Sequence, residues 1–219
     1  MGLPLHALKA LKPYLKGKVL SLGYPDLIVS SKDIEDLFGY KPTKFTQVHE
    51  WHGRKEPLPE TLELFQKLGC ELTVVDFTSE TGHERIADLN YPHDLGKHDL
   101  VIDPGTLEHC FNIGQAFLNA ANAVKVGGVI CHLSPLDMMN HGFYNLNPTL
   151  FHDFFLQNGW VITDLTVMPF QVPTIHPTNR FTLFAEHISR VIALRKTDTP
   201  LKFPVQTKYI EKMKSKDKT

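Results

Sequence analysis

The sequence has few cysteines and no long apolar segment. Cys70, Cys110 and Cys131 are its three cysteines among 219 residues. Their odd number, wide spacing and apolar neighbourhoods favour reduced core thiols over a disulfide or zinc framework. No stretch approaches the roughly 18 apolar residues that span a bilayer, and the start of the chain lacks the basic and apolar segments of a signal peptide. We therefore expect a cytoplasmic protein with no membrane association.

A strong excess of charge is also lacking, because the net charge is −1. Residues 201–219 carry six lysines against Glu211 and Asp217, or +4, so the preceding 200 residues carry −5. A polar segment with little to bury favours a solvated, flexible tail, and contact with a polyanion is the alternative. Enzymes of nucleic acids more often have a basic surface on the folded body, so the acidic body favours another kind of partner.

The composition is that of an ordinary globular protein, with 42% hydrophobic and 21% charged residues. A chain of this length supports one sizeable core. We therefore predict one domain over residues 1–200 and a separate basic tail over residues 201–219.

Apolar β-rich segments alternate with segments of helical periodicity. This order is typical of a parallel sheet with crossover helices, so we predict an α/β, doubly wound, mostly parallel sheet. The expected strands are residues 18–22, 71–77, 99–102, 129–133, 161–167 and 189–195, with a seventh near 181–185. The expected helices are residues 31–37, 58–68, 113–124 and 148–157, the first capped by Ser30 or Ser31 and the last by Asn147.

The first two strands are separated by 48 residues, where about 20 would suffice for a helix and its loops. The excess lies at about residues 41–57. We interpret this segment as an insertion that forms a lid, a dimer contact or an inert surface loop. A homodimer is therefore compatible with the sequence.

The turn after the first strand lacks the glycines of a phosphate-binding loop. Gly23 is followed by Tyr24, Pro25 and Asp26. A dinucleotide needs close approach of its pyrophosphate to a glycine-rich backbone, so this turn argues against one. A nucleoside ligand without phosphate tolerates fewer glycines.

Acidic residues follow the later strands, where ligands of open parallel sheets bind. Asp76 ends the second strand, and its carboxylate could accept both hydroxyl protons of a ribose or cap a helix. Asp88 lies in the next loop and could accept from the exocyclic amine of an adenine. Because Pro92 follows, Asp88 could equally be a turn residue.

Four segments together resemble class I S-adenosylmethionine-dependent methyltransferases. They are ELTVVD at residues 71–76, ADL at 87–89, DLVIDPGTLEH at 99–109 and KVGG at 125–128. The resemblance runs over residues 18–159. It implies a Rossmann-like fold, S-adenosyl-L-methionine as the cofactor and methyl transfer as the reaction.

The resemblance also implies a set of cofactor contacts. Asp76 would bind the ribose, Asp88 would contact the adenine, and the Leu-Glu-His segment would lie beside the methyl group. The sequence departs from the family at the first loop, where only Gly23 remains of the glycine-rich turn. The implied cofactor-binding residues are Gly23, Tyr24, Asp26, Asp76, Phe77, Asp88, Leu89 and Asp103.

Residues 141–148 resemble members found with sugar and small-molecule biosynthesis, which implies a small-molecule or sugar acceptor. An acceptor that carries a proton needs a base. The candidates are Glu108, His109, His132 and His141, and we prefer the last two because the pKa of histidine lies near working pH. The alternative for each histidine is a hydrogen-bonded or exposed side chain without a catalytic task. Tyr144 could form an aromatic wall.

Residues 49–52, His-Glu-Trp-His, are the one tempting metal motif. Their histidines are three residues apart, whereas metalloprotease helices place them four apart, so we predict no metal site. Two other functions stay open. One is a nucleic-acid methyltransferase, and the other is a binding or scaffold protein that retains the fold without transferring methyl groups.

Overall fold

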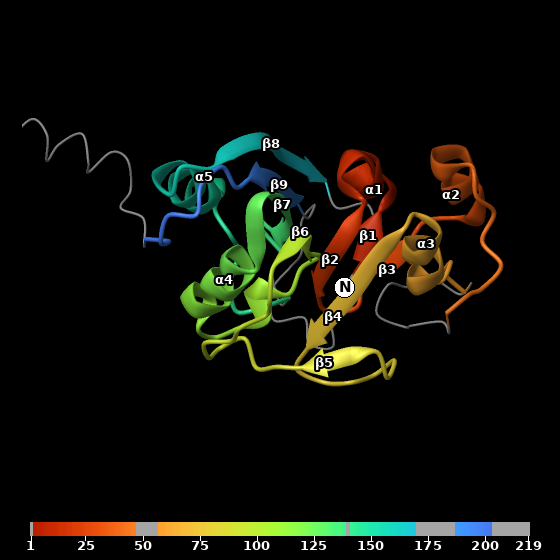
Figure 1. The fold of residues 1–219 in the computed structure, drawn as a ribbon, viewed down its shortest axis with the longest axis horizontal. Coiled ribbons are helices and arrows are strands. Elements are labelled where there is room, and N and C mark those ends of the chain that lie inside the picture. The colour runs from red at the N-terminus through yellow and green to blue at the C-terminus, as the bar shows by residue number, and fades with distance from the viewer. Residues whose placement is uncertain (1, 47–56, 139–140, 170–186, 203–219) are drawn as a thin grey trace, which may run out of the picture.

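The main element of the structure, a computed structural model, is a seven-stranded sheet with the strand order β5-β4-β2-β6-β7-β9-β8 (Figure 1). The structure describes residues 2–46, 57–138, 141–169 and 187–202. The first five strands in this order are parallel, and β9 is antiparallel to both of its neighbours. The strands are β2 (Gly17–Leu22), β4 (Cys70–Asp76), β5 (Glu84–Ile86), β6 (His98–Asp103), β7 (Val124–Pro135), β8 (Val161–Pro169) and β9 (His187–Leu194).

Strand order reverses between β2 and β6, which lie side by side although β3, α2, α3, β4 and β5 come between them in the chain. In a doubly wound sheet this reversal marks the switch point, where ligands bind. The predicted α/β, doubly wound, mostly parallel sheet of seven strands is confirmed.

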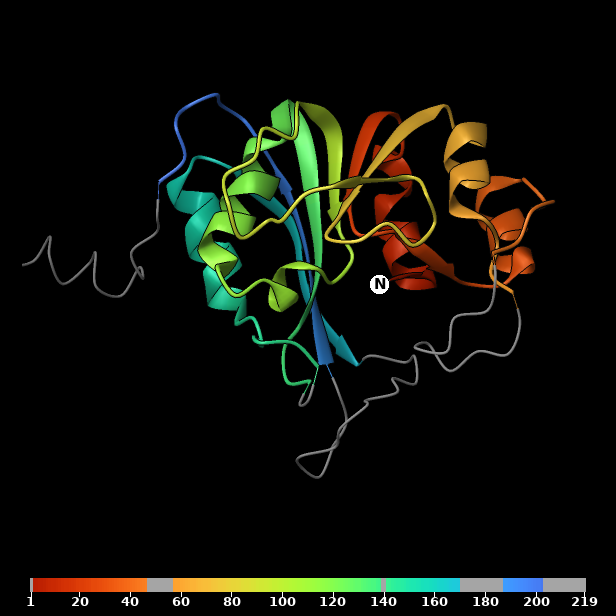
Figure 2. The ribbon, with the colours of Figure 1, turned by 90° about the horizontal axis from the view of Figure 1, so that it is seen from below.

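Helices cover both faces of the sheet, which Figure 2 shows between them. One face is covered by α1 (Leu5–Leu11), α2 (Ser31–Phe38) and α3 (Thr61–Lys67), and the other by α4 (Ile113–Asn122) and α5 (Pro148–Gln157). In β2, Val19 belongs to the first core and Leu20 to the second, as the period-two alternation of a strand requires. Each such fully buried side chain stabilises the fold by roughly 1.5–3 kcal/mol.

The ends of α2 were predicted well because both carry local signals. Ser30 and Asp33 form a reciprocal capping box at the first turn. Gly39 ends the helix with φ of 69°, a left-handed conformation that glycine adopts without strain.

The predicted start of α3 was wrong. Glu60 is the N-cap, and its carboxylate accepts hydrogen bonds from the backbone of Leu62 and Glu63 at 3.0 and 2.6 Å. Pro59, which we expected in the first turn, instead pairs with Phe45 in an isolated β-bridge. The acidic N-cap directly after the proline therefore determines where this helix begins.

The predicted end of α4 and start of β7 were also wrong, because Val124 already belongs to the strand. Gly127 and Gly128 lie within β7 and do not precede it. A Cβ atom at Gly128 would lie about 3.0 Å from carbonyl oxygens of His98, Asp99 and Lys125. Close backbone approach thus requires glycine at this position.

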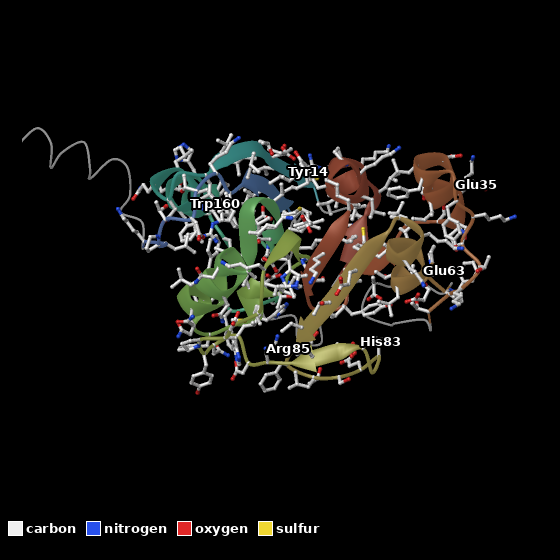
Figure 3. The ribbon with its side chains drawn as sticks, in the orientation of Figure 1. Tyr14, Glu35, Glu63, His83, Arg85 and Trp160 are labelled. Atoms are coloured by element: carbon white, nitrogen blue, oxygen red, sulfur yellow. The ribbon has the colours of Figure 1, made fainter. Side chains whose placement is uncertain are left out.

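Three short strands had no recognisable pattern in the sequence. β1 (Gly2–Pro4) and β3 (Asp26–Ile28) form a separate two-stranded parallel sheet, and β5 completes the main sheet as its seventh strand. Figure 3 shows His83 and Arg85 at this edge strand. The strand predicted near residues 181–185 lies outside the described residues, as does the His-Glu-Trp-His motif at 49–52.

The start of the predicted insertion contacts α3. The backbones of Thr43 and Lys44 both donate to the Glu63 carboxylate at 3.0 Å. The predicted tail begins with ordered contacts, since Lys202 exchanges two hydrogen bonds with Asn158 at the end of α5. Among the described residues, no helix is long and apolar enough to cross a membrane.

Candidate functional site

The carboxyl ends of four parallel strands lie along one side of the sheet, and we call this side the carboxyl edge. Leu22 at the end of β2 is paired with Val75 of β4, and Asp103 at the end of β6 is paired with His132 of β7. The backbone N–H of Gly23 donates to the Val75 carbonyl at 2.7 Å, so the Gly23 turn lies next to the end of β4. The strand ends at which we expect a ligand therefore lie side by side.

The turn after β2 is held by the start of α3. Gly23 has φ of 81°, and its carbonyl accepts from the hydroxyl of Ser21 at 2.7 Å. The Tyr24 hydroxyl donates to the Glu60 carboxylate, and burial together with this contact raises the pKa of Tyr24. Asp26, predicted as a cofactor contact, is buried in β3.

Asp76 lies at the end of β4, beside this turn. Its Oδ1 accepts from the backbone N–H groups of Phe77 and Thr78 at 2.6 and 3.4 Å. Among the described residues its other oxygen, Oδ2, accepts no hydrogen bond, and the side chain is half-buried. The neighbouring Phe77 is 69% exposed.

Asp88 organises the loop between β5 and β6. Its Oδ1 accepts from the backbone and the side-chain amide of Asn90 at 3.0 and 2.7 Å. Leu89 is buried, and its carbonyl accepts from Asn119 of α4 at 3.1 Å. Asp88 thus has the turn role that we considered for it, while its Oδ2 accepts no hydrogen bond within the described part of the chain.

Asp103 and His132 form a fully buried pair, with Oδ2 and Nδ1 2.8 Å apart. The other oxygen of Asp103 accepts from the Thr106 backbone at 2.8 Å, and the Thr106 hydroxyl donates to the carbonyl of Leu22. The imidazole of His132 stacks on Phe117 with ring centroids 5.0 Å apart. This network fixes the turn that leads into η3 (Leu107–His109) and joins it to the end of β2.

Glu108 lies in η3 and contacts two histidines. Its Oε1 is 3.3 Å from Nε2 of His141 and 3.9 Å from Nε2 of His109. The Glu108 side chain is 1% exposed, whereas those of His109 and His141 are 43% and 24% exposed. The cluster is therefore a buried carboxylate that two partly exposed imidazoles cover.

Within this cluster the pKa of Glu108 is raised and the pKa of His109 is lowered. Burial, followed by the negative charge of Asp103, raises the pKa of Glu108 to about 8. Burial also lowers the pKa of His109 from its ordinary value, against the opposing effect of Glu108. Near neutral pH these shifts favour a protonated Glu108 beside a neutral His109.

The segment that carries His141 packs closely against the η3 turn. The Phe143 N–H donates to the Glu108 carbonyl and the Tyr144 hydroxyl to the Phe111 carbonyl, each at 2.8 Å. A Cβ atom at Gly142 would lie 2.8 Å from the Glu108 carbonyl oxygen. Only glycine allows this contact, a signal that the sequence analysis missed.

Cys110 is influenced by the acidic residues that follow the carboxyl ends of the strands. Burial raises the pKa of its thiol to about 12, and further contributions come from the negative charges of Asp103, Asp88, Glu108 and Asp76. These four carboxyl groups are therefore close enough to act electrostatically on one buried thiol, although they are spread over 33 residues of sequence. The sequence analysis assigned no chemistry to the cysteines.

A hollow of about 380 Å³ lies elsewhere, between residues 92–97 and α4. Its lining includes Lys97, Gln115 and Asn122 and none of the predicted site residues. The carboxylate and histidine chemistry is therefore at the strand ends and not in this hollow.

Solved structures share this architecture. TehB from Haemophilus influenzae matches with a TM-score of 0.54 at 13% identity, over 86% of this chain and 61% of TehB. The N-methyltransferase NodS from Bradyrhizobium japonicum WM9 has a TM-score of 0.46 at 14% identity, over 87% and 93% of the two chains. A S-adenosylmethionine-dependent methyltransferase from Clostridium acetobutylicum ATCC 824 has a TM-score of 0.43 at 10% identity, over 83% and 85%.

The chain has the class I methyltransferase fold. This chain spans about three fifths of the length of TehB. At such low sequence identity, the similarity establishes the fold and nothing about activity or substrate. No family model matches the sequence, and no curated protein is similar to it.

Proposed function

We propose that the protein is an S-adenosylmethionine-dependent methyltransferase that acts on a small-molecule or sugar acceptor. The observation that carries the proposal is the position of Asp76 directly beside the Gly23 turn, at the switch point of the sheet. Because a fold alone does not determine an activity, the argument depends on these residues.

The residues at the carboxyl ends of the strands fit S-adenosylmethionine as the cofactor. Asp76 retains Oδ2 for ribose hydroxyls, and Asp88 retains Oδ2 for an adenine amine. The cofactor supplies a methyl group that its positively charged sulfonium already activates, and the negative charges of Asp76, Asp88 and Asp103 favour a cation electrostatically. The protein's own tasks are then to align the reactants, exclude water and hold protons.

His109 is the best-suited proton acceptor of the cluster. A general base must be unprotonated at working pH, and burial keeps the pKa of His109 low. Glu108, with its raised pKa, would hold a proton and donate a hydrogen bond to an imidazole. His132 has no exposed surface, so we assign it and Asp103 to positioning the η3 turn.

Exposed aromatic rings favour a small acceptor with an apolar face. Phe77, Phe111 and Phe143 are 69%, 74% and 68% exposed, and the last two rings are in edge-to-face contact at 5.8 Å. Large exposed aromatics next to polar groups are typical of binding surfaces. A sugar ring or a planar metabolite could stack on them.

A second candidate is a binding protein that retains the fold without catalysis. The observation in its favour is the first loop, where Tyr24 and Pro25 are held by Glu60 and Thr61 of the α3 segment. A loop fixed in this way has less freedom to enclose a cofactor.

Incubation with methyl-labelled cofactor and fractionated cell extract tests the proposal. We expect label in the small-metabolite or glycan fraction, with His109→Ala reducing it at least tenfold and the distant His152→Ala leaving it unchanged. Label in RNA or DNA would contradict the proposed acceptor class. Cofactor binding without transfer to any fraction would favour the non-catalytic candidate.

A further inference from the structure

We propose that Glu108, His109 and His141 form a binding site for a divalent transition-metal ion of the zinc type. This site goes beyond the proposed function, and its presence does not depend on the cofactor. It also differs from the motif at residues 49–52, whose spacing led us to predict no metal site. The three residues come from two segments, η3 and the segment after β7, which the fold brings together.

The distances between the donor atoms fit a metal centre. The oxygen and the two ring nitrogens all lie within 4.8 Å of one another, and the shortest separation, from Glu108 to His141, is 3.3 Å. In a tetrahedral zinc site with bonds of about 2.0–2.1 Å, donor atoms lie about 3.3 Å apart. His109 is the most exposed of the three side chains, and its Nε2 lies 3.9 Å from Oε1 of Glu108.

The burial of Glu108 is the second observation that points to a ligand. Within the described residues, its Oε2 is fully buried and has no hydrogen-bond partner. A buried carboxyl oxygen without a partner is costly to a fold. A cation held between Oε1 and the two imidazoles would neutralise the carboxylate, and bidentate binding by Glu108 would give Oε2 a partner as well.

Surrounding contacts hold the donors in place. The Asp103–His132 pair fixes the turn that carries Glu108 and His109, and the Phe143 N–H fixes the Glu108 backbone. Gly142 lets the His141 segment approach within van der Waals contact of Glu108. Residues that orient ligands in this way raise the affinity of metal sites.

Two imidazoles with one carboxylate are ligands that Zn²⁺, Co²⁺ and Fe²⁺ accept, whereas Mg²⁺ and Ca²⁺ prefer oxygen alone. Three protein ligands leave a coordination position open for water or for an oxygen of a bound molecule. If the proposed function is correct, an acceptor hydroxyl bound there would lose its proton to water more readily. The metal would then replace His109 as the means of removing that proton, because a metal-bound ring nitrogen cannot accept one.

The test is a titration of the full chain, freed of metal by chelation and dialysis, with Co²⁺ and with Zn²⁺ in the absence of any cofactor. Calorimetry gives the affinity, and the visible absorption of Co²⁺ reports nitrogen and oxygen ligation in a low-coordinate site. We expect one site, with His109→Ala and His141→Ala each weakening binding at least tenfold. His152→Ala is the matched control, because His152 also pairs with a carboxylate, 2.8 Å from Asp153, but lies outside the cluster.

Binding that survives both cluster substitutions would overturn the proposal, as would binding abolished by replacing His49 and His52 together. The absence of any stoichiometric site in the wild-type chain would overturn it as well. Thermal shift with adenosylhomocysteine, measured on the same metal-free samples, tests the proposed function separately. Either result can fail while the other stands.

Discussion

Among single residues, Glu108 has the environment least suited to its own charge. The buried carboxyl contacts two imidazoles on one side and lies near the negative charge of Asp103 on the other. Groups whose pKa values are shifted strongly by burial and by a neighbouring charge are concentrated at functional sites. A group that is this costly to bury is therefore a candidate for a functional role.

The first prediction concerns Glu108→Gln in metal-free protein. The folded pKa is about 8, above the ordinary value of 4.5, so the unfolded chain releases this proton first. Stability of the wild type should therefore fall as pH rises from about 4.5 to 8, by at most about 1.4 kcal/mol per pH unit. The variant should lack this component in urea unfolding at pH 5 and pH 8, and identical pH dependence of the two proteins would contradict the burial argument.

The second prediction concerns Asp88. If its carboxylate accepts from the adenine amine, Asp88→Ala should weaken adenosylhomocysteine binding by roughly 1–3 kcal/mol. Calorimetry measures this change. Asn90→Ala is the control, because it removes a partner of Asp88 within the turn while leaving the carboxylate. Equal losses in both variants would assign Asp88 to the turn alone.

At this scale the sequence supplied the candidates but not their contacts. Glu108, His109 and His141 were named from sequence, yet nothing in the spacing of residues 109 and 141 indicates that both reach one carboxylate. The burial of His132 was easier to predict from sequence, because its neighbours Cys131 and Leu133 form part of a continuous apolar strand. Such strands are buried on both faces in parallel sheets.

Among the elements, α3 is joined to the start of the insertion by hydrogen bonds. Thr43 and Lys44 donate backbone hydrogen bonds to Glu63 on α3, and Figure 3 shows Glu63 on this helix and Glu35 on the separate α2. Burial alone would raise the pKa of Glu63, but these hydrogen bonds and that of the Thr43 hydroxyl lower it to about 2.

The third prediction follows from that shift. Glu63 contributes stability that is fully present above pH 4.5 and is lost as pH falls toward 2, because the folded pKa lies below the unfolded one. Glu63→Gln should destabilise the protein by roughly 1–3 kcal/mol at pH 7 and much less at pH 3. Glu35→Gln, on the exposed surface of α2, should change neither value. Chemical unfolding at the two pH values would contradict the account if Glu63→Gln cost the same at both.

Local signals explain which elements could be predicted. α2 and α5 have side-chain caps and glycine or asparagine ends, and their bounds were predicted to within one residue. The three-residue strands β1, β3 and β5 are too short to show periodicity. Their pairing depends on tertiary contacts, which no local pattern encodes.

For the molecule as a whole, alternation of apolar strands and amphipathic helices was enough to predict the doubly wound sheet. The same reasoning predicts a ligand site at the carboxyl ends of the strands, where four acidic residues act electrostatically on Cys110. The single-glycine loop after β2 could not be interpreted from sequence, because its contacts with Glu60 and Thr61 come from 36 residues away.

The most direct test of the account is thermal melting with adenosylhomocysteine. A ligand at a hundred times its dissociation constant adds about 2.7 kcal/mol, which should raise the wild-type midpoint by about 5–10 °C for a chain of this size. Asp76→Ala should lose most of that shift while its unliganded midpoint barely moves, and NAD should shift neither protein. An unchanged wild-type midpoint with millimolar adenosylmethionine and adenosylhomocysteine would contradict the assignment of the cofactor to this edge of the sheet.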